Sequence, residues 1–466
     1  MKSVFSLFPV VLIVVCGYLS SISQAATSVT LAEKELTSLI RNTKGAKTDV
    51  VLIYKDGKII YQNYAREYGI NTKHLSWSLG KTISGILIGI AESEGLLSFN
   101  DQVRKYFPKY HSNARILDLL GMSSGLKYKE EYDGFPSDLD ITNMMYLKGP
   151  PQGFAHYMIN LPPSPEGEAG SYFNYSSGDT NVLMAILQKA IGNQAVYNKY
   201  PWDKFFKPMG IDATFEQDLN GTFAGASYIY MKATDFLKVG QLIVNRGMWS
   251  GQQIIPNKYF DLMNRVADGV QQKVQKGNDK TKAYSAHVTT NLPIEGRGLP
   301  STYNDLPLDA LILYGHQGQI IVASPSQNVV ILKLAMDKKA LSSINFYAAV
   351  KKLILAKDLS YETVASIKGI NSLDHEPETR GVISTILSIP HLLRAYGAKE
   401  YCSCRLVVGR SEAACKDDLK AQSLVIPKLK IKNDGTVTAT LGLGLFKKSK
   451  AVYRGKSFGC VLTKTE

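Results

Sequence analysis

The chain has 466 residues and a mass of 51.3 kDa; 45% of its residues are hydrophobic and 20% are charged. This composition excludes long disordered, collagen-like and coiled-coil chains, and the length fits two or three domains, or one large domain with a small appendage. The net charge is +14, but residues 401–466 carry 13 Lys/Arg against 5 Asp/Glu, a net +8, so most of the basic excess belongs to the tail.

Residues 1–25 are predicted to be a secretory signal peptide. Lys2 supplies a positive start, Val4–Val15 is mostly apolar, and Ser23-Gln24-Ala25 has the small-x-small pattern of a cleavage site. An uncleaved anchor is the alternative, but the apolar run is short for a bilayer. A lipoprotein site at Cys16 is less favoured because no small residue precedes it. We therefore expect an exported protein, periplasmic or secreted, that does not span a membrane after signal cleavage.

The elements that follow predict one sheet assembled from both ends of a domain, with a helical insert between them. The sequence first predicts an amphipathic helix at Leu31–Lys44, a β-hairpin of Val50–Tyr54 and Ile59–Tyr64 around Asp56-Gly57, and a buried helix at Ser78–Leu97. Short helices and long loops follow from about 100 to 300. The last predicted elements are a second hairpin of Leu311–Ala323 and Val329–Ala335 and a closing helix at Ala340–Leu355. This arrangement indicates an α/β fold.

The C-terminal part is predicted to be a separate small domain. Residues 26–360 form the main domain, 361–395 a connector and 396–466 a basic, β-rich domain. Its short β-like runs are Arg405–Val408, Ser423–Ile426, Val437–Thr440 and Ala451–Tyr453, with Asn433-Asp434-Gly435 as a turn.

Four cysteines lie in this C-terminal region, at positions 402, 404, 415 and 460. In an exported protein an even, clustered set predicts two disulfides that stabilise a domain too small to hold itself together by its core alone. Three pairings are possible, and a bond between the near neighbours Cys402 and Cys404 is disfavoured. A zinc site is the alternative, but the usual Cys-x-x-Cys spacing is missing, so we expect no metal.

Ser78 and Lys81 open the predicted buried helix, one turn apart on the same face, so the lysine can reach the serine hydroxyl. Desolvation in an apolar helix disfavours a charged lysine, and a neutral lysine can activate a serine nucleophile. The N–H groups at the helix start could stabilise an oxyanion. Since Ser-x-x-Lys is common by chance, a plain helix start with a surface lysine is the alternative.

Two further groups of polar residues strengthen the catalytic interpretation. Tyr175-Ser176-Ser177 precedes a predicted helix at Asn181–Ile191. His316-Gln317-Gly318 interrupts the predicted apolar strand Leu311–Ala323, where polar residues are costly unless they face a site.

The three motifs, in this order and at these separations, resemble those of the class C β-lactamase-related serine hydrolases. This group includes D-alanyl-D-alanine carboxypeptidases, family VIII esterases and 6-aminohexanoate-dimer hydrolase. The resemblance covers about residues 45–355, and Tyr172–Gly192, Gly225–Gly247 and Tyr314–Ala335 look closest to the 6-aminohexanoate-dimer hydrolase-like branch. It implies a β-lactamase/transpeptidase-like fold, an antiparallel sheet flanked by helices, in addition to the C-terminal β-rich domain.

The resemblance also implies a role for each motif residue. Ser78 would be the acylated nucleophile, Lys81 its base and Tyr175 the proton shuttle to the leaving group. His316 would replace the lysine of the third motif. The backbone N–H groups of Ser78 and Gln319, beside Gly318, would form the oxyanion hole. No cofactor is implied.

Two departures from the family pattern shift the expected substrate. Ser177 stands where the second motif usually has asparagine, which shortens a contact to the lysine region. His316 replaces a permanently cationic lysine, so attraction for a substrate carboxylate is weaker at neutral pH. Both changes favour amides or esters over penicillins.

Other candidate residues are weaker. Gly121–Gly125 matches the Gly-x-Ser-x-Gly elbow around Ser123, but a helix end rather than a strand precedes it. Trp77, Tyr228 and Tyr230 could line a substrate pocket, although buried aromatic residues usually belong to a core. The histidines at 74, 111, 156, 287, 375 and 391 are scattered, and solvent or packing roles are expected for them.

The expected function is therefore hydrolysis of a small-molecule amide or ester through an acyl-enzyme. The alternatives are a D-alanyl-D-alanine carboxypeptidase or weak β-lactamase, and a non-catalytic envelope-binding protein. The basic tail could bind an anionic envelope surface or merely keep the protein soluble. No nucleic-acid partner is expected.

Overall fold

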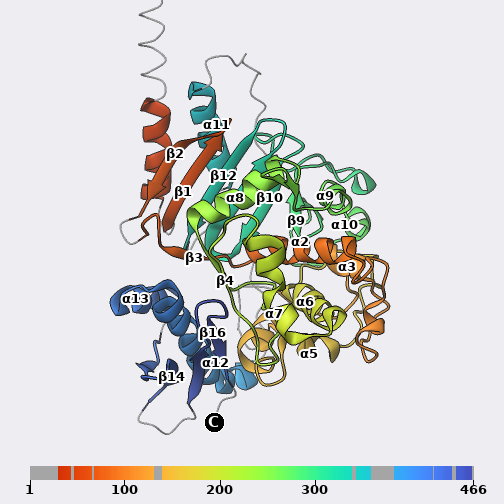
Figure 1. Cartoon of the computed structure of the whole chain (residues 1–466), viewed down its shortest axis with the longest axis vertical. Coiled ribbons are helices and arrows are strands. Elements are labelled where there is room, and N and C mark those ends of the chain that lie inside the picture. Colours follow the sequence, from red (N-terminus) through yellow and green to blue (C-terminus); the bar gives the residue numbers. More distant parts are fainter. Residues whose placement is uncertain are drawn as a thin grey trace, which may run out of the picture. The chain divides into compact units, whose positions relative to one another are not determined.

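A seven-stranded sheet combines strands from both ends of the predicted main domain (Figure 1). The computed structural model describes residues 30–43, 47–65, 68–130, 139–337, 343–357, 382–422, 425–442 and 448–463. The predicted signal peptide lies outside these residues. The sheet order is β2 (Lys58–Tyr64), β1 (Thr48–Lys55), β12 (Val329–Ala335), β11 (Gln319–Ser324), β10 (Leu311–Gly315), β9 (Val288–Thr290) and β8 (Ala283–Ser285). The predicted α/β fold, with one sheet built from both ends, is confirmed.

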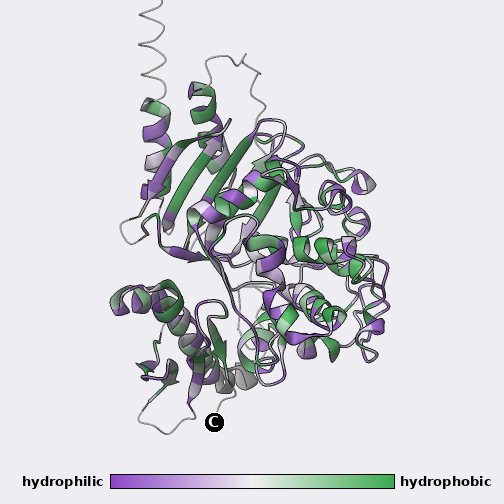
Figure 2. Ribbon diagram, in the orientation of Figure 1, coloured by the Kyte–Doolittle hydropathy of each residue, from purple (hydrophilic) through white to green (hydrophobic). Residues whose placement is uncertain are grey.

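The two predicted hairpins are present in this sheet. β1 and β2 pair antiparallel around Asp56 and Gly57, both with positive φ, as a tight two-residue turn requires. β11 and β12 pair antiparallel from Ile320–Lys333 to Ser324–Val329. Figure 2 shows the central strands as mainly hydrophobic and the edge strand β2 as mainly hydrophilic. Burial of the central strands therefore follows their apolar sequences.

Helices fill the segment between the strands. They are α2 (Leu79–Ser93), α3 (Ile116–Leu120), α4 (Asp140–Thr142), α5 (Phe154–Ile159), α6 (Ser177–Ile191), α7 (Gln194–Pro201), α8 (Ala233–Val244), α9 (Asn257–Met263) and α10 (Asp268–Gln272). Single-turn 3₁₀ or π segments lie at Val103–Lys105, Asn143–Leu147, Trp202–Phe206 and Glu295–Arg297. Short strands β3 (Lys73–Leu75), β5 (Ile229–Lys232) and β4 (Thr214–Phe215) form a second sheet, and β6 (Met248–Trp249) pairs with β7 (Gln252–Gln253).

Helix α2 is buried on nearly all sides. Its residues from Leu79 to Ala91 are all buried, as a helix rich in Ile, Leu and Gly on nearly every side predicts. Two glycines permit this packing: a Cβ atom at Gly85 or Gly89 would approach Tyr259 of α9 within 2.1 and 2.5 Å, respectively. Helix α8 packs equally closely on the sheet, since a Cβ atom at Gly240 would lie 2.3 Å from Val330 of β12.

The described residues divide into two compact units. One contains helix 30–42 and α11 (Ser343–Lys357), which share the ion pairs Lys352–Glu35 and Lys357–Glu33. The other spans 49–336 together with 376–466, so the main sheet and the C-terminal residues belong to the same unit. No helix in the described parts of the chain is long and apolar enough to cross a membrane.

The C-terminal part, here called the C-terminal module (residues 382–463 as described), contains a small sheet and two helices. Its elements are α12 (Val382–Cys402), a π-helical turn at Ser403–Val408, α13 (Glu412–Gln422), β13 (Lys428–Ile431), β14 (Thr436–Thr440), β15 (Ser449–Tyr453) and β16 (Cys460–Leu462). The separate β-rich sheet is confirmed, and its strands pair antiparallel in sequence order. The disulfides are Cys402–Cys460 and Cys404–Cys415.

Some predicted boundaries in this module differ from the structure. Arg405–Val408 was expected as a strand, but it lies in the π-helical turn that continues α12. The predicted connector 361–395 overlaps the first part of α12, and its earlier part lies outside the described residues. Arg405–Val408 thus continues the helical backbone of α12 directly after the two disulfide-bonded residues Cys402 and Cys404.

A buried ion pair joins the module to the main body. Glu216, fully buried after β4, accepts hydrogen bonds from Lys399 Nζ of α12, from Ser403 Oγ (2.8 Å) and from the Cys460 N–H (2.8 Å). Lys399 Nζ also lies 3.7 Å above the Tyr228 ring. Among the described residues, every hydrogen-bond partner of this carboxylate comes from the module, so removing the module would leave its charge without any of them.

We expect Glu216→Ala to lower the free energy of unfolding by about 3–5 kcal/mol, because it leaves Lys399 buried without its counter-ion. Urea denaturation of the full chain measures this. The matched control is Asp203→Ala, which removes an exposed ion pair with Lys207 and should cost at most about 1 kcal/mol. Equal effects of the two substitutions would contradict the importance of the buried pair. Independent folding of the module stays a prediction, which truncation after Lys357 tests.

Candidate active site

The segment before α2 is held in a strained turn. Trp77 has a φ of +43°, a left-handed conformation that is unfavourable for a bulky residue, and Ser78 caps the helix directly after it. The Ser76 N–H donates to the Ile229 carbonyl (2.8 Å), and the Ile229 N–H donates to Ser76 Oγ (3.2 Å). Strand β5 therefore fixes the backbone from which Ser78 projects.

Lys81 lies at the centre of a compact polar cluster. Its side chain is 1% exposed, and Nζ donates to Ser78 Oγ (2.7 Å), to Ser177 Oγ (2.8 Å) and to the Ala226 carbonyl (3.3 Å). Three oxygen atoms therefore lie within hydrogen-bond distance of Nζ. Helices α2 and α6 thus bring the first and second motifs into direct contact, although 96 residues separate Lys81 from Ser177.

Ser177 links this cluster to Glu130, a residue that the sequence analysis missed. Ser177 Oγ donates to Glu130 Oε1 (2.7 Å), and the Ser177 N–H donates to Glu130 Oε2 (2.5 Å). Both carboxylate oxygens therefore hold the first residue of α6. No local pattern marks Glu130, because it follows the loop after α3 and reaches Ser177 only through the fold.

Glu130→Gln is expected to lower kcat/KM by about 10- to 100-fold. The amide offers one acceptor where Ser177 has two donors, and a hydrogen bond to a charged group contributes about 1.5–3 kcal/mol. The exposed Glu168→Gln variant serves as the matched control. If Glu130→Gln changed only the melting temperature and left kcat and KM at wild-type values, a role in positioning Ser177 would be wrong.

Tyr175 lies beside the same lysine. Its ring centroid is 4.9 Å from Lys81 Nζ, its N–H donates to Asn278 Oδ1 (3.2 Å), and its ring meets Tyr284 edge to face at 6.1 Å. Ser176, the next residue, is the N-cap of α6 and accepts from the Asp179 N–H (3.0 Å). The helix start therefore fixes the backbone of the second motif next to Lys81.

The third motif is not inside a strand, as the sequence analysis expected, but forms the turn between β10 and β11. His316–Gly318 is a 3₁₀ turn in which Gln317 has a φ of +65° and Gly318 of +89°, and Gly315 pairs with Gln319 across it. The apolar residues on both sides conceal this reversal in the sequence. At Gly315 a Cβ atom would lie 2.8 Å from the Ser76 carbonyl oxygen, so the turn packs directly on the entry to α2.

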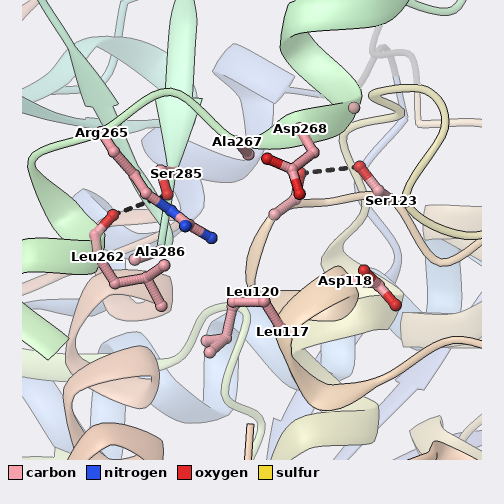
Figure 3. A pocket seen from close by; sticks show the side chains of 13 residues that line it. Leu117, Asp118, Leu120, Ser123, Leu262, Arg265, Ala267, Asp268, Ser285 and Ala286 are labelled. Carbon is pink, nitrogen blue, oxygen red and sulfur yellow. Dashed lines mark hydrogen bonds between the residues drawn. The ribbon is translucent and has the colours of Figure 1, made fainter. Parts of the chain in front are cut away.

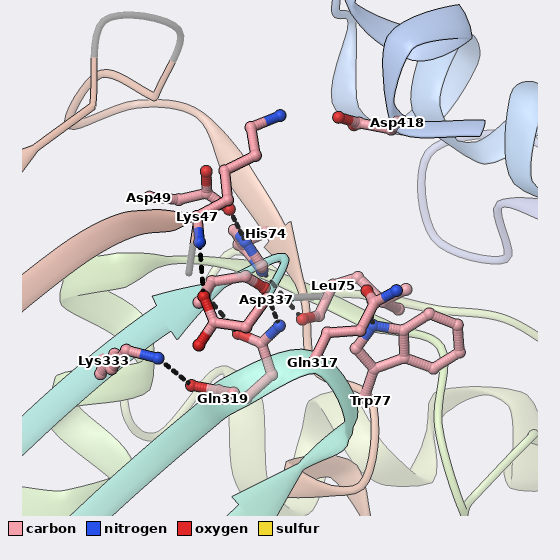
Figure 4. Close-up of polar contacts among 12 residues, drawn as sticks. Lys47, Asp49, His74, Leu75, Trp77, Gln317, Gln319, Lys333, Asp337 and Asp418 are labelled. Atoms are coloured by element: carbon pink, nitrogen blue, oxygen red, sulfur yellow. Dashed lines mark hydrogen bonds and ion pairs between the residues drawn. The ribbon is translucent and has the colours of Figure 1, made fainter. Parts of the chain in front are cut away.

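Trp77, which directly precedes Ser78, contacts this turn, and Figure 4 shows its indole beside Gln317. Its Nε1–H donates to Gln317 Oε1 (3.2 Å), and its ring packs edge to face on His316 with centroids 5.4 Å apart. The buried Lys333 of β12 supports the turn from behind by donating to the Gly318 carbonyl (3.1 Å). The predicted third-motif residue His316 thus lies next to the residue that precedes the candidate nucleophile.

Three bulky residues in the left-handed region gather at this point. Trp77, Gln317 and Tyr228 all have φ between +43° and +65°, and the Trp77 and Tyr228 rings are 6.1 Å apart. Such conformations cost of order 1–3 kcal/mol each and concentrate at functional sites. The strain supports a functional role for this region rather than a purely structural one.

The backbone N–H of Ser78 is available for a ligand. Within the described parts of the chain no residue accepts a hydrogen bond from it, as expected at the start of a helix. The Gln319 side chain is engaged elsewhere, since Nε2 donates to the Ala335 carbonyl and Oε1 accepts from the Ala335 N–H (3.0 Å). The oxyanion role of the two backbone N–H groups stays a prediction.

His287 packs between α2 and α6 behind Lys81. Its carbonyl accepts from Thr82 Oγ1 (2.7 Å), and its Nε2 lies 3.1 Å from Thr180 Oγ1. Burial, reinforced by nearby Lys81, lowers the pKa of His287 to about 3. The imidazole is therefore neutral at physiological pH and places no positive charge next to Lys81.

Ser123 of the Gly-x-Ser-x-Gly sequence lies in a different pocket (Figure 3). Its Oγ donates to the Gly121 carbonyl (3.2 Å), and Asp118, Arg265 and Asp268 are among its pocket neighbours. No histidine lines this pocket. Ser123 consequently has no base comparable to the lysine that contacts Ser78.

Comparison with known sequences places the chain among known proteins. The profile of the family described as Beta-lactamase matches residues 36–346. The 6-aminohexanoate-dimer hydrolase of Paenarthrobacter ureafaciens is 23% identical over 226 residues, which cover 46% of this chain and 56% of that protein. The chain thus matches little more than half the length of this curated relative.

Solved structures share the fold. A putative 6-aminohexanoate-dimer hydrolase from Bacillus anthracis has a TM-score of 0.52 at 18% identity, covering 67% of this chain and 80% of its own. A penicillin-binding protein homologue from Caulobacter crescentus has a TM-score of 0.50 at 14% identity, covering 72% and 98%, respectively.

Proposed function

The chain belongs to the Beta-lactamase family, and from this premise we propose that it is a serine hydrolase that cleaves small amide or ester bonds through an acyl-enzyme on Ser78. The observation that carries the proposal is the position of Lys81 Nζ, 2.7 Å from Ser78 Oγ and 2.8 Å from Ser177 Oγ. A nucleophile within hydrogen-bond reach of its base, with the base oriented by a third group, is typical of covalent catalysis.

In the proposed reaction, Lys81 acts as the neutral amine and accepts the proton of Ser78 as Ser78 Oγ attacks the substrate carbonyl carbon. The Ser78 and Gln319 N–H groups stabilise the tetrahedral oxyanion. Tyr175, adjacent to Lys81, passes the proton to the leaving amine or alcohol as its bond to the carbonyl breaks. Water then attacks the ester of Ser78, which releases the acid and restores the serine proton. Glu130 keeps Ser177 and Lys81 in position.

The test compares substrates on the full chain. A fluorogenic ester, a linear ω-amino acid dimer and nitrocefin are assayed together, with fluorophosphonate labelling as the readout for a reactive serine. Turnover of the ester or the amide with labelling at Ser78 is the expected result. Faster turnover of nitrocefin would favour the weak β-lactamase or carboxypeptidase alternative. Absence of both labelling and turnover would favour a non-catalytic envelope-binding protein.

We also propose that the protein is exported and that its basic tail can contact an anionic envelope surface. The support is the signal-like sequence of residues 1–25 and the net +8 of residues 401–466. Cell fractionation tests the export. Envelope binding should weaken as the salt concentration rises, because salt screens the attraction between charges. Binding whose strength does not change with salt concentration would contradict an electrostatic contact.

A further inference from the structure

The C-terminal module closes a pocket beside the candidate nucleophile. The pocket has a cavity volume of about 80 Å³, which suits one end group of a substrate rather than a whole small molecule. Trp77 and Gln317 line it from the main body, and Tyr396 and Glu400 line it from α12. Building on the proposed hydrolase function, we propose that this pocket binds a protonated amine of the substrate and that Glu400 is the residue that recognises it.

Glu400 is anchored through one of its two oxygens. Oε1 accepts hydrogen bonds from the Tyr228 hydroxyl (2.9 Å) and the Tyr146 hydroxyl (3.2 Å), and these two hydroxyls are 2.6 Å apart. No hydrogen bond from a described residue reaches Oε2. The carboxylate is therefore held in a fixed position with one oxygen available to a ligand.

Glu400 also differs from the other ionisable residues that line the pocket. Lys73 pairs with Asp212, His74 with Asp49, and Arg410 with Asp418. The neighbouring Lys399 is paired with Glu216. Among the described residues the hydrogen-bond partners of Glu400 are only neutral hydroxyls. Lys399 acts on it only through its charge, without a salt bridge, and this charge opposes the effect of burial on the pKa of Glu400.

The surroundings of Glu400 suit a cation more than an anion. Burial raises the pKa of Glu400 above its ordinary value, so a bound cation would relieve an unfavourable desolvation. The rings of Trp77, Tyr230 and Tyr396 also line the pocket, and aromatic faces attract ammonium groups.

The pocket is connected to the chemistry through Trp77. This residue directly precedes Ser78, and its ring lies 6.1 Å from that of Tyr228, whose hydroxyl holds Glu400. A substrate with its carbonyl at Ser78 could therefore place an amine-bearing chain along Trp77 towards Glu400. The preferred substrates are accordingly amides or esters of ω-amino acids.

The test uses p-nitrophenyl esters of ω-amino acids, each matched with a neutral ester in which a methyl group replaces the ammonium. The wild-type chain should prefer the ammonium ester of at least one pair. Glu400→Gln keeps an oxygen for the two tyrosines but removes the charge, and should reduce that preference by about 10- to 100-fold. Glu412→Gln removes an exposed glutamate paired with Lys416 on the same module and should leave the preference unchanged.

A second measurement separates recognition from catalysis. Hexylammonium and hexanol are titrated calorimetrically into the full-length wild-type protein and into Glu400→Gln. If the wild type binds hexylammonium more strongly than hexanol and the variant loses this difference, the amine pocket is supported. This conclusion holds even if no ester is hydrolysed; that result would contradict only the proposed hydrolase function. No preference for ammonium in the wild type overturns the amine proposal whether or not the variant folds. Equal losses of kcat/KM on the ammonium ester and on its neutral match in Glu400→Gln would overturn the proposal as well.

Discussion

Ser78→Ala is expected to lower kcat/KM by at least about 1,000-fold while leaving the melting temperature nearly unchanged. Loss of a covalent nucleophile typically costs several orders of magnitude. The substitution removes a single hydrogen bond, and Lys81 retains Ser177 Oγ and the Ala226 carbonyl as acceptors. Its effect on the free energy of unfolding should therefore be about 1 kcal/mol. Steady-state kinetics with a fluorogenic ester and a thermal melt provide the two readouts.

The chain offers a matched control for this experiment in Ser123. It is a buried serine in a Gly-x-Ser-x-Gly sequence whose hydroxyl contacts only a backbone carbonyl in the described structure. Ser123→Ala should keep wild-type kcat/KM. Activity above about 1% in Ser78→Ala, or loss of activity in Ser123→Ala alone, would show that the nucleophile is not Ser78.

Lys81→Ala and Tyr175→Phe should each reduce kcat/KM almost as much as Ser78→Ala, because the three residues are proposed to act as a unit. Lys81 contacts both serines of the cluster, and the Tyr175 ring lies 4.9 Å from its Nζ. The double variant should then be little worse than either single variant, since losses within a catalytic unit are not additive. The double-mutant cycle on kcat/KM measures this.

Thermal melts of the same proteins provide the control for folding. Tyr175→Phe keeps the ring and its edge-to-face contact with Tyr284, so its melting temperature should match the wild type. Multiplicative losses in the double variant would indicate that Lys81 and Tyr175 act in separate steps. A Tyr175→Phe variant with full activity would exclude its hydroxyl from proton transfer.

The sequence predicted the parts of the structure that depend on local patterns. The Asp56-Gly57 turn specifies its hairpin, and the apolar run after Ser78 specifies a buried helix with Lys81 one turn along. The turn at Gln317 was wrongly assigned to a strand because apolar β-formers flank it on both sides. Its left-handed φ depends on tertiary contacts such as the Trp77 hydrogen bond.

Residues that act through contacts with distant parts of the chain could not be identified from the sequence pattern around them. Glu130 reaches Ser177 across 47 positions, and Glu400 reaches Tyr228 across 172. Each is an ordinary glutamate in its own segment. Helix α12 was divided between a connector and a domain because its charges and cysteines cluster at one end. These contacts follow only from the assembled fold.

The sheet order has a consequence for the time course of folding. β1 ends at Lys55 but neighbours β12, which begins at Val329, so pairing must close a loop of more than 270 residues. Such non-local contacts raise the contact order and slow folding. The hydrogen bonds of Glu216 likewise cannot form until Lys399 and Cys460, which lie far later in the chain, have been synthesised. Chains that have not yet synthesised these residues would expose apolar strands and an unmatched carboxylate, which makes nascent and truncated forms the species most prone to aggregate.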